Sequence, residues 1–193
     1  MTLERLPSGV VEAPLSWSSI IGGALVAVAT SVFLGLLAAG FGLELASSGV
    51  ASRGSLHAFT PQAGAIAVAI QVIAGAFGGY VAGRLRTIWT ETHADESHLR
   101  DTAHGLIAWA LATVLGVALA MLVVIPYADS LAPAAAAAPP PSPAEADRAA
   151  HIAAQSAFFA AIGLILAAFV SAVAARLGGQ QAEHMHLRHL ARG

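Results

Sequence analysis

The fold is decided by the stretch Ala74-Gly75-Ala76-Phe77-Gly78-Gly79-Tyr80-Val81-Ala82-Gly83-Arg84-Leu85, which ends an apolar run that begins near Gln62. Gly75, Gly79 and Gly83 recur at every fourth residue, so on a helix they form a ridge without side chains. Glycine inside a helix costs about 1 kcal/mol relative to alanine in water. In lipid, small residues let two helix backbones approach closely, and the contact replaces a hydrophobic drive that hydrocarbon lacks. This glycine ridge therefore predicts a helix-packing face inside a membrane.

The composition of the whole chain is that of a membrane protein. Of its 193 residues 57% are hydrophobic and 10% are charged, and the mean hydropathy is +0.73. Crossing the hydrocarbon takes about 20 helical residues, and four apolar segments are long enough: 17–43, 62–85, 104–127 and 152–177. Uninterrupted apolar runs exclude a transmembrane barrel. We predict an all-α, polytopic membrane protein with four transmembrane helices.

The positions of the arginines predict the orientation, because cytoplasmic flanks retain positive charge. If the helices alternate in direction, Arg53 and Arg148 lie on one side of the membrane. The other basic residues lie on the opposite side: Arg5, Arg84, Arg86, Arg100, Arg176, Arg188 and Arg192. We therefore expect both termini in the cytoplasm and the first helix to act as a retained signal anchor. Arginine as the only basic residue, with abundant alanine, is typical of a GC-rich bacterial genome, so we expect a bacterial inner membrane.

The other three predicted helices also carry ladders, meaning small residues at spacing four. The ladders are Ser19, Gly23, Ala27, Ser31, Gly35 and Ala39; Ala108, Ala112, Gly116 and Ala120; and Gly163, Ala167, Ser171 and Ala175. Such rows typically face another helix in a membrane. With the glycine ridge, the predicted helix-packing residues are Gly23, Ala27, Gly35, Gly75, Gly79, Gly83, Gly163, Ala167 and Ser171.

A shift of 92 residues aligns the two halves of the chain. It places Val81-Ala82-x-Arg84-Leu85 on Val173-Ala174-x-Arg176-Leu177, and Trp17 on Trp109. The same shift maps the glycine ridge onto Ala167, Ser171 and Ala175. We predict two tandem antiparallel hairpins that form a parallel internal repeat, related by an axis along the membrane normal.

Few polar side chains fall in the middle of the predicted helices. Gln71 lies near the centre of 62–85, where it either hydrogen-bonds across helices, contributing about 1 kcal/mol, or lines a polar path; we favour the hydrogen bond. The remaining mid-membrane polar residues are Thr30, Ser31, Thr113 and Ser171. No charged relay accompanies them, which disfavours proton-coupled transport.

Two groups of residues offer weak candidates for a metal site. Glu91, Asp95 and His98 would share one face of a helix and carry hard ligands. We favour a solvated connector there, with Asp101 just before the next helix, where its charge meets the positive end of the helix dipole. In the tail, His186 and His189 lie near one another on a helix, but a disordered or interfacial tail is the favoured interpretation. We predict no metal and no cofactor.

Three segments outside the predicted helices complete the organisation. Residues 1–16 form a cytoplasmic arm, and residues 178–193 form a His-rich cytoplasmic tail. Residues 129–151 form a periplasmic loop rich in alanine and proline, which we expect to be extended and mobile because proline clusters favour polyproline conformations.

Several of these patterns together resemble a group of four-span bacterial inner-membrane proteins of unassigned activity, some labelled PhnA-like. The matching stretches are Leu15-Ser16-Trp17-Ser18-Ser19-Ile20-Ile21-Gly22-Gly23, Gly40-Phe41-Gly42-Leu43, Gly78-Gly79-Tyr80-Val81-Ala82-Gly83-Arg84-Leu85, and His104-Gly105-Leu106 followed by Trp109-Ala110-Leu111. The resemblance implies a four-helix inner-membrane protein. It implies no activity and no catalytic residues, and the label gives no reason to infer phosphonate chemistry.

The motifs of enzymes are absent from the sequence, which has no paired nucleophile and base, phosphate loop or HExxH spacing. The leading hypothesis is a non-enzymatic membrane protein that packs through its small-residue faces into a homo-oligomer or onto a larger membrane complex. The alternative is a small channel or transporter with a path between the two hairpins or at an oligomer axis. Its partners would be the bilayer and membrane proteins; a net charge of −2 argues against nucleic acid.

Overall fold

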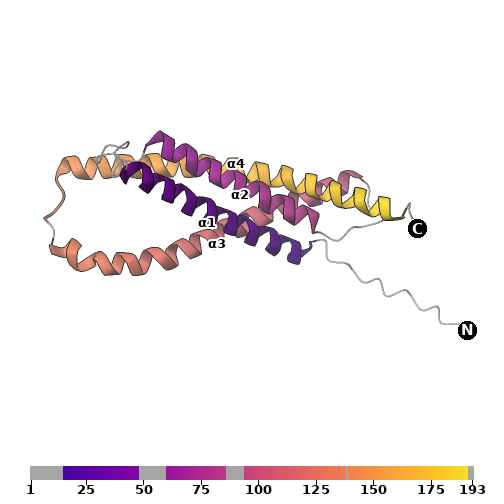
Figure 1. The fold of residues 1–193 in the computed structure, drawn as a ribbon, viewed down its shortest axis with the longest axis horizontal. Coiled ribbons are helices and arrows are strands. Elements are labelled where there is room, and N and C mark those ends of the chain that lie inside the picture. Colours follow the sequence, from indigo (N-terminus) through magenta and orange to yellow (C-terminus); the bar gives the residue numbers. More distant parts are fainter. Residues whose placement is uncertain (1–14, 48–59, 86–93, 138, 191–193) are drawn as a thin grey trace, which may run out of the picture.

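The chain folds into four helices, as Figure 1 shows. The computed structural model describes residues 15–47, 60–85, 94–137 and 139–190. The helices are α1 (Trp17–Ser47), α2 (Pro61–Arg84), α3 (Ala94–Ala137) and α4 (Pro143–Leu190). Each contains a segment long and apolar enough to cross a membrane: Trp17–Gly42, Pro61–Arg84, Leu99–Ser130 and Pro143–Ala182. No strand occurs within the described ranges. The predictions of an all-helical chain and of four membrane helices are confirmed.

Helix α2 has the clearest local signals at its ends. Thr60 is the N-cap, and its side-chain oxygen accepts a hydrogen bond from the backbone N–H of Ala63 at 3.2 Å. Pro61 takes the first helical position, where the missing N–H costs nothing. At the other end the N–H of Leu85 donates to the carbonyl oxygen of Val81 at 3.0 Å. These signals set the observed bounds within one residue of the predicted 62–85.

Helices α3 and α4 are longer than predicted, with 44 and 48 residues. The prediction of an extended loop over 129–151 is wrong, because α3 continues to Ala137 and α4 begins at Pro143. Alanine has the highest helix propensity, so its runs extend α3 past Pro126 and Pro133. The tail also continues as helix, to Leu190.

A capping box explains why α4 begins where it does. The backbone N–H and the hydroxyl of Ser142 both donate to Oε2 of Glu145, each at 2.7 Å. In return the N–H of Glu145 donates to the Ser142 hydroxyl at 3.4 Å. This reciprocal arrangement satisfies backbone donors that the first helical turn leaves open.

Helix α2 packs along both α1 and α4, whereas α3 joins the bundle only in part. Figure 1 shows the C-terminal half of α3 diverging from the other three helices. Large side chains there are exposed, including Leu122 (71%) and Val123 (70%). We call the end where α1 begins the inner end and the opposite end the outer end. The bundle is therefore closed at the inner end and open between α1 and α3 toward the outer end.

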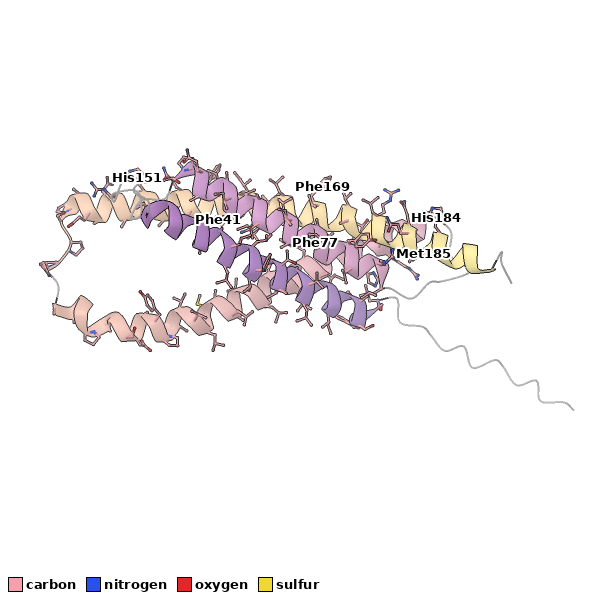
Figure 2. The ribbon with its side chains drawn as sticks, in the orientation of Figure 1. Phe41, Phe77, His151, Phe169, His184 and Met185 are labelled. Atoms are coloured by element: carbon pink, nitrogen blue, oxygen red, sulfur yellow. The ribbon has the colours of Figure 1, made fainter. Side chains whose placement is uncertain are left out.

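The core consists of small side chains. Ile20 is its largest apolar member, and the rest of the buried apolar residues are alanines: Ala24, Ala27, Ala74, Ala82, Ala108, Ala167, Ala172 and Ala175. Large apolar residues point outward instead, among them Phe41, Phe77 and Phe169, which are labelled in Figure 2. Exposed aromatic and aliphatic side chains are what a lipid-facing surface requires, and close backbone contact between small residues holds the helices together.

Candidate functional site: a cavity between the four helices

The glycine ridge forms the contact between α2 and α4. A Cβ added at Gly75 would lie 2.8 Å from the carbonyl oxygen of Ala167. Added at Gly79 or Gly83, it would overlap the backbone of Ser171 or Ala175. These are the same residue pairs that the shift of 92 aligns in the sequence. Because the obstructing atoms are backbone and not side-chain ends, no rotamer change would make room for a methyl group here.

Two further predicted packing residues lie between α1 and α2. A Cβ added at Gly23 would be 2.5 Å from the carbonyl oxygen of Gly78 and 2.7 Å from Cβ of Ala82. One added at Gly78 would be 2.7 Å from Cβ of Ala27. Gly35 differs, because a Cβ added there meets nothing within 4 Å in the described chain. The α1 ladder therefore packs at its inner end and is open at its outer end.

Above these contacts lies a cavity of about 630 Å³, lined by all four helices. We call it the central cavity. Its lining residues are Ala27, Val28, Ser31 and Val32 of α1; Gln71, Ala74, Gly75 and Gly78 of α2; Trp109, Ala112, Thr113, Gly116, Val117, Leu119, Ala120 and Val123 of α3; and Ala160, Leu164, Ala167 and Ser171 of α4. None of these side chains carries a charge. The cavity lies between the two predicted hairpins, α1–α2 and α3–α4.

The size of the central cavity has an energetic consequence. A sealed void of 630 Å³ would be costly, because unfilled enclosed volume costs about 24 cal/mol per Å³. The central cavity avoids this cost because it is open on one side, where lipid chains, a ligand or a partner helix can enter.

Two side chains that line the central cavity have buried polar atoms without a hydrogen-bond partner in the described part of the chain. They are Oε1 of Gln71 and Nε1 of Trp109. Oε1 of Gln71 rests against Gly163, since a Cβ added at that glycine would overlap the amide. The hydrogen bond across helices expected for Gln71 is thus not made by its carbonyl oxygen in the described chain.

Two of the three hydroxyl groups of the cavity wall donate to backbone carbonyl oxygens. The hydroxyl of Thr113 donates to the carbonyl oxygen of Trp109 at 2.9 Å, within α3. The hydroxyl of Ser171 donates to the carbonyl oxygen of Gly105 at 2.8 Å, from α4 to α3. These two groups keep their acceptor lone pairs. The carbonyl oxygen of Gln71 and the indole N–H of Trp109 are the buried polar atoms of the wall without a partner in the described chain.

Two buried polar residues of α3, Asp101 and His104, lie at the inner end of the bundle. Asp101 is 1% exposed and His104 is 3% exposed. The backbone N–H of Ser16 donates to Nε2 of His104 at 3.0 Å, and Nδ1 of His104 lies 2.7 Å from the carbonyl oxygen of Arg100. Because Nε2 accepts, Nδ1 carries the proton and donates to that carbonyl. His104 thus joins the start of α1 to α3.

The expected position of Asp101 just before a helix is wrong. Helix α3 already begins at Ala94, so Asp101 lies two turns inside it. Its carboxylate packs against Gly179, where an added Cβ would overlap it. Two features of the sequence point to this arrangement. The spacing of Asp101 and His104 places them on one face of a helix, and the predicted tail begins with the glycine pair Gly178-Gly179.

A second group of polar contacts joins α2 to α4 near the same end. The hydroxyl of Tyr80 donates to Oε1 of Gln181 at 2.6 Å. The guanidinium of Arg84 donates to the Tyr80 oxygen at 3.2 Å and to Oε1 of Gln181 at 3.1 Å. Gly178 makes this approach possible, because a Cβ there would overlap the carbonyl oxygen of Tyr80. Arg84 therefore binds neighbouring side chains as well as flanking the membrane.

The weak metal candidates lie largely outside what the structure describes. Glu91 falls outside the described residues. The backbone of Asp95 and His98 belongs to α3, and that of His186 and His189 belongs to α4, but their side chains are not among those described. Within the described residues, no three or more histidine, cysteine or acidic side chains gather as a metal site would require. Both candidate sets stay predictions.

Comparison with known proteins adds no assignment: no protein-family model, no curated protein and no solved structure matches the chain. The resemblance to four-span bacterial inner-membrane proteins therefore stays a prediction.

Proposed function

We propose that this chain is a non-enzymatic integral membrane protein of the small channel or transporter class, with its pathway between the hairpins α1–α2 and α3–α4. The observation that carries the proposal is the central cavity, to which all four helices contribute. Its wall includes Ser31, Gln71, Thr113 and Ser171, four of the five mid-membrane polar residues in the sequence. Polar groups in a membrane interior typically face a pathway or a binding site.

The packing around the cavity supports a path that is closed at one end. Below the cavity, a Cβ added at Gly105 would lie 2.5 Å from the carbonyl oxygen of Ser171 and 2.8 Å from Cβ of Ala175. Gly23 makes an equally close contact with Gly78 on the other side of the bundle. The inner end is thus sealed by backbone contacts, whereas α3 diverges at the outer end. This is the arrangement of a transporter or channel in one closed state.

A plugging substitution tests the pathway. Within the described residues a Cβ added at Gly116 meets nothing within 4 Å, so the side chain of Gly116→Phe is expected to project into the cavity without displacing a helix. Val114→Phe is the matched control, because Val114 lies on the same helix, is 65% exposed and does not line the cavity. The full chain is reconstituted in liposomes and assayed with a panel of small neutral solutes, monovalent ions and protons.

The expected result is permeation of at least one member of the panel, reduced about tenfold by Gly116→Phe and unchanged by Val114→Phe. A tenfold effect corresponds to about 1.4 kcal/mol in the barrier. Absence of flux for every solute and ion, or equal flux through both variants, would overturn the proposed pathway.

A second candidate function, self-association or attachment to a larger membrane complex, is favoured by the open ends of two ladders. In the part of the chain that the structure describes, added Cβ atoms at Gly35 and Gly116 meet no neighbour within 4 Å, whereas Gly23 and Ala108, on the same two ladders, lie in tight or buried positions. These open rungs leave a small-residue surface that a second copy would fit.

Because the chain contains no cysteine, single-cysteine variants test this candidate directly. Gly35→Cys is expected to form disulfide-linked dimers under mild oxidation in native membranes. Phe33→Cys, two residues away and 63% exposed, lies on the opposite side of α1 and is expected to stay monomeric. Monomers from both variants would reject association through this ladder.

We also propose that the hairpins are parallel repeats and that both termini face the cytoplasm of a bacterial cell. The pairing of Gly79 with Ser171 and of Gly83 with Ala175 supports the repeat, because residues related by a two-fold axis between parallel helices meet at the same height. The distribution of arginine supports the orientation. An Arg192→Cys variant that reacts with membrane-impermeant thiol reagents in intact cells would contradict the orientation.

A further inference from the structure

The wall of the central cavity restricts the charge of what it holds. No aspartate, glutamate, lysine, arginine or histidine lines it. A charged molecule would lose its hydration there without gaining a counter-charge. Most of the wall consists of glycine, alanine, valine and leucine side chains, and the volume falls within the range of about 300–1,000 Å³ that small-molecule sites occupy. The occupant is therefore uncharged and has a mainly apolar body.

The polar groups of the wall indicate one polar end on that occupant. Nε1 of Trp109 is a donor and Oε1 of Gln71 is an acceptor, and neither has a partner in the described chain. Rotation about the last side-chain torsion of glutamine, which has a broad two-fold preference, turns either amide atom toward the cavity. A group that both donates and accepts, such as a hydroxyl or a carboxamide, is complementary to this pair.

The mouth of the cavity lies on the lipid side. Several residues of the cavity wall are also exposed, among them Val32 of α1 (51%) and Val117, Leu119 and Val123 of α3 (54%, 46% and 70%). They belong to α1 and α3, the helices between which the divergence of α3 opens a gap (Figure 1). A molecule dissolved in the bilayer would enter the cavity through this gap without crossing water, and the side chains of Gln71 and Trp109 would turn to meet its polar end.

From these observations we propose that the central cavity binds an uncharged amphiphile taken from the bilayer, with its hydroxyl or carboxamide end between Gln71 and Trp109. This inference deepens the proposed function and rests on it, in that the same cavity forms the pathway. The proposed ligand class, uncharged amphiphiles, excludes free ions and charged lipids.

Fluorescence of Trp109 provides the test. The substitutions Trp17→Phe and Trp89→Phe leave Trp109 as the single tryptophan of the full chain. The protein is placed in phosphatidylcholine vesicles that contain a brominated long-chain alcohol, the corresponding brominated fatty acid at a pH where it is ionised, or brominated phosphatidylcholine. Bromine quenches tryptophan on contact, so quenching reports occupancy.

The expected result is saturable quenching by the alcohol at a few mole per cent, reversed by the unbrominated alcohol and absent for the ionised acid. Gly116→Phe abolishes the saturable component and Val114→Phe leaves it intact. Gln71→Leu raises the half-saturating fraction about fivefold, the loss of one net hydrogen bond. Quenching that is linear and equal for the alcohol and the brominated phosphatidylcholine would overturn the inference.

The flux and quenching assays separate the two proposals. Flux without saturable quenching removes the amphiphile site and leaves the pathway. Saturable quenching without flux of any panel member removes the channel or transporter function and leaves a membrane-embedded binding site.

Discussion

Replacing Gly79 with alanine adds one methyl group at the tightest kind of contact in the molecule. The added Cβ overlaps the backbone of Ser171, so α2 and α4 must separate or shift. Overpacking of a close-packed interface costs about 1–3 kcal/mol, and a backbone obstacle that cannot rotate away places this case near 3 kcal/mol. The higher helix propensity of alanine offsets about 1 kcal/mol of this overpacking cost. We expect Gly79→Ala to lower the free energy of unfolding by about 2 kcal/mol.

Gly35 supplies the matched control, because a Cβ added there meets nothing within 4 Å in the described chain. Gly35→Ala keeps the gain in propensity without the overlap, so it raises the stability by up to about 1 kcal/mol. The two variants, which make the same chemical change, should thus differ by about 3 kcal/mol. The difference between them excludes any general effect of the substitution on the unfolded chain.

The assay is reversible unfolding of the full chain in mixed micelles, with helix content followed by circular dichroism as the fraction of denaturing detergent rises. Gly83→Ala should behave like Gly79→Ala, since its Cβ overlaps the backbone of Ala175. Gly75→Ala should be milder, because its closest contact is 2.8 Å. Equal midpoints for Gly79→Ala and Gly35→Ala would refute the close contact between α2 and α4.

Three further substitutions test other parts of the structure. His104→Ala removes the acceptor for the N–H of Ser16 and should lower the free energy of unfolding by about 2 kcal/mol, whereas His104→Gln, which keeps an acceptor, should lose less than half of that in the same detergent titration. Gly163→Ala displaces the flexible amide of Gln71 and not a backbone, so the free energy of unfolding should change by less than about 1 kcal/mol. The half-saturating fraction of brominated alcohol in the quenching assay should shift. A large loss of stability would contradict this contact. Ser142→Ala breaks the capping box, a local loss of about 1 kcal/mol, and should speed amide hydrogen exchange in the first turn of α4 without moving the global midpoint.

The fold was largely predictable from the sequence because lipid leaves so few options. Apolar runs of sufficient length must form helices, and that argument located all four. The boundaries of α3 and α4 were not predictable in the same way. Alanine runs between prolines permit either an extended loop or a helix, and the prediction for 129–151 weighted proline over alanine. The misplacement of Asp101 follows from the same underestimate at the start of α3.

The candidate site was predictable only residue by residue. The sequence singled out Gln71, Ser31, Thr113 and Ser171 as the polar groups at membrane depth, but not that they meet around one cavity. Trp109 was noted as the counterpart of Trp17 in the repeat and within a stretch that carries the resemblance, but not as a polar group of a site. Its role depends on an indole N–H that finds no partner, and that is a property of the assembled helices and not of any spacing.

The small residues have two opposite effects in this bundle, and the difference lies in what faces them. Where the glycine ridge meets Ala167, Ser171 and Ala175, backbone approaches backbone and the space closes. Farther out, small residues of α1 and α3 face one another across the central cavity, and the space that larger side chains would fill is part of the cavity volume. A ladder that served only to pack helices within this chain would be in contact along its whole length. Because Gly35 and Gly116 make no such contact in the described chain, these two positions remain open to a molecule from outside it, in line with the proposals above. A second copy seated there would cover the mouth that an amphiphile needs, so dimers linked through Gly35→Cys should show less saturable quenching of Trp109 than the uncrosslinked protein, and unchanged quenching would place the two surfaces apart.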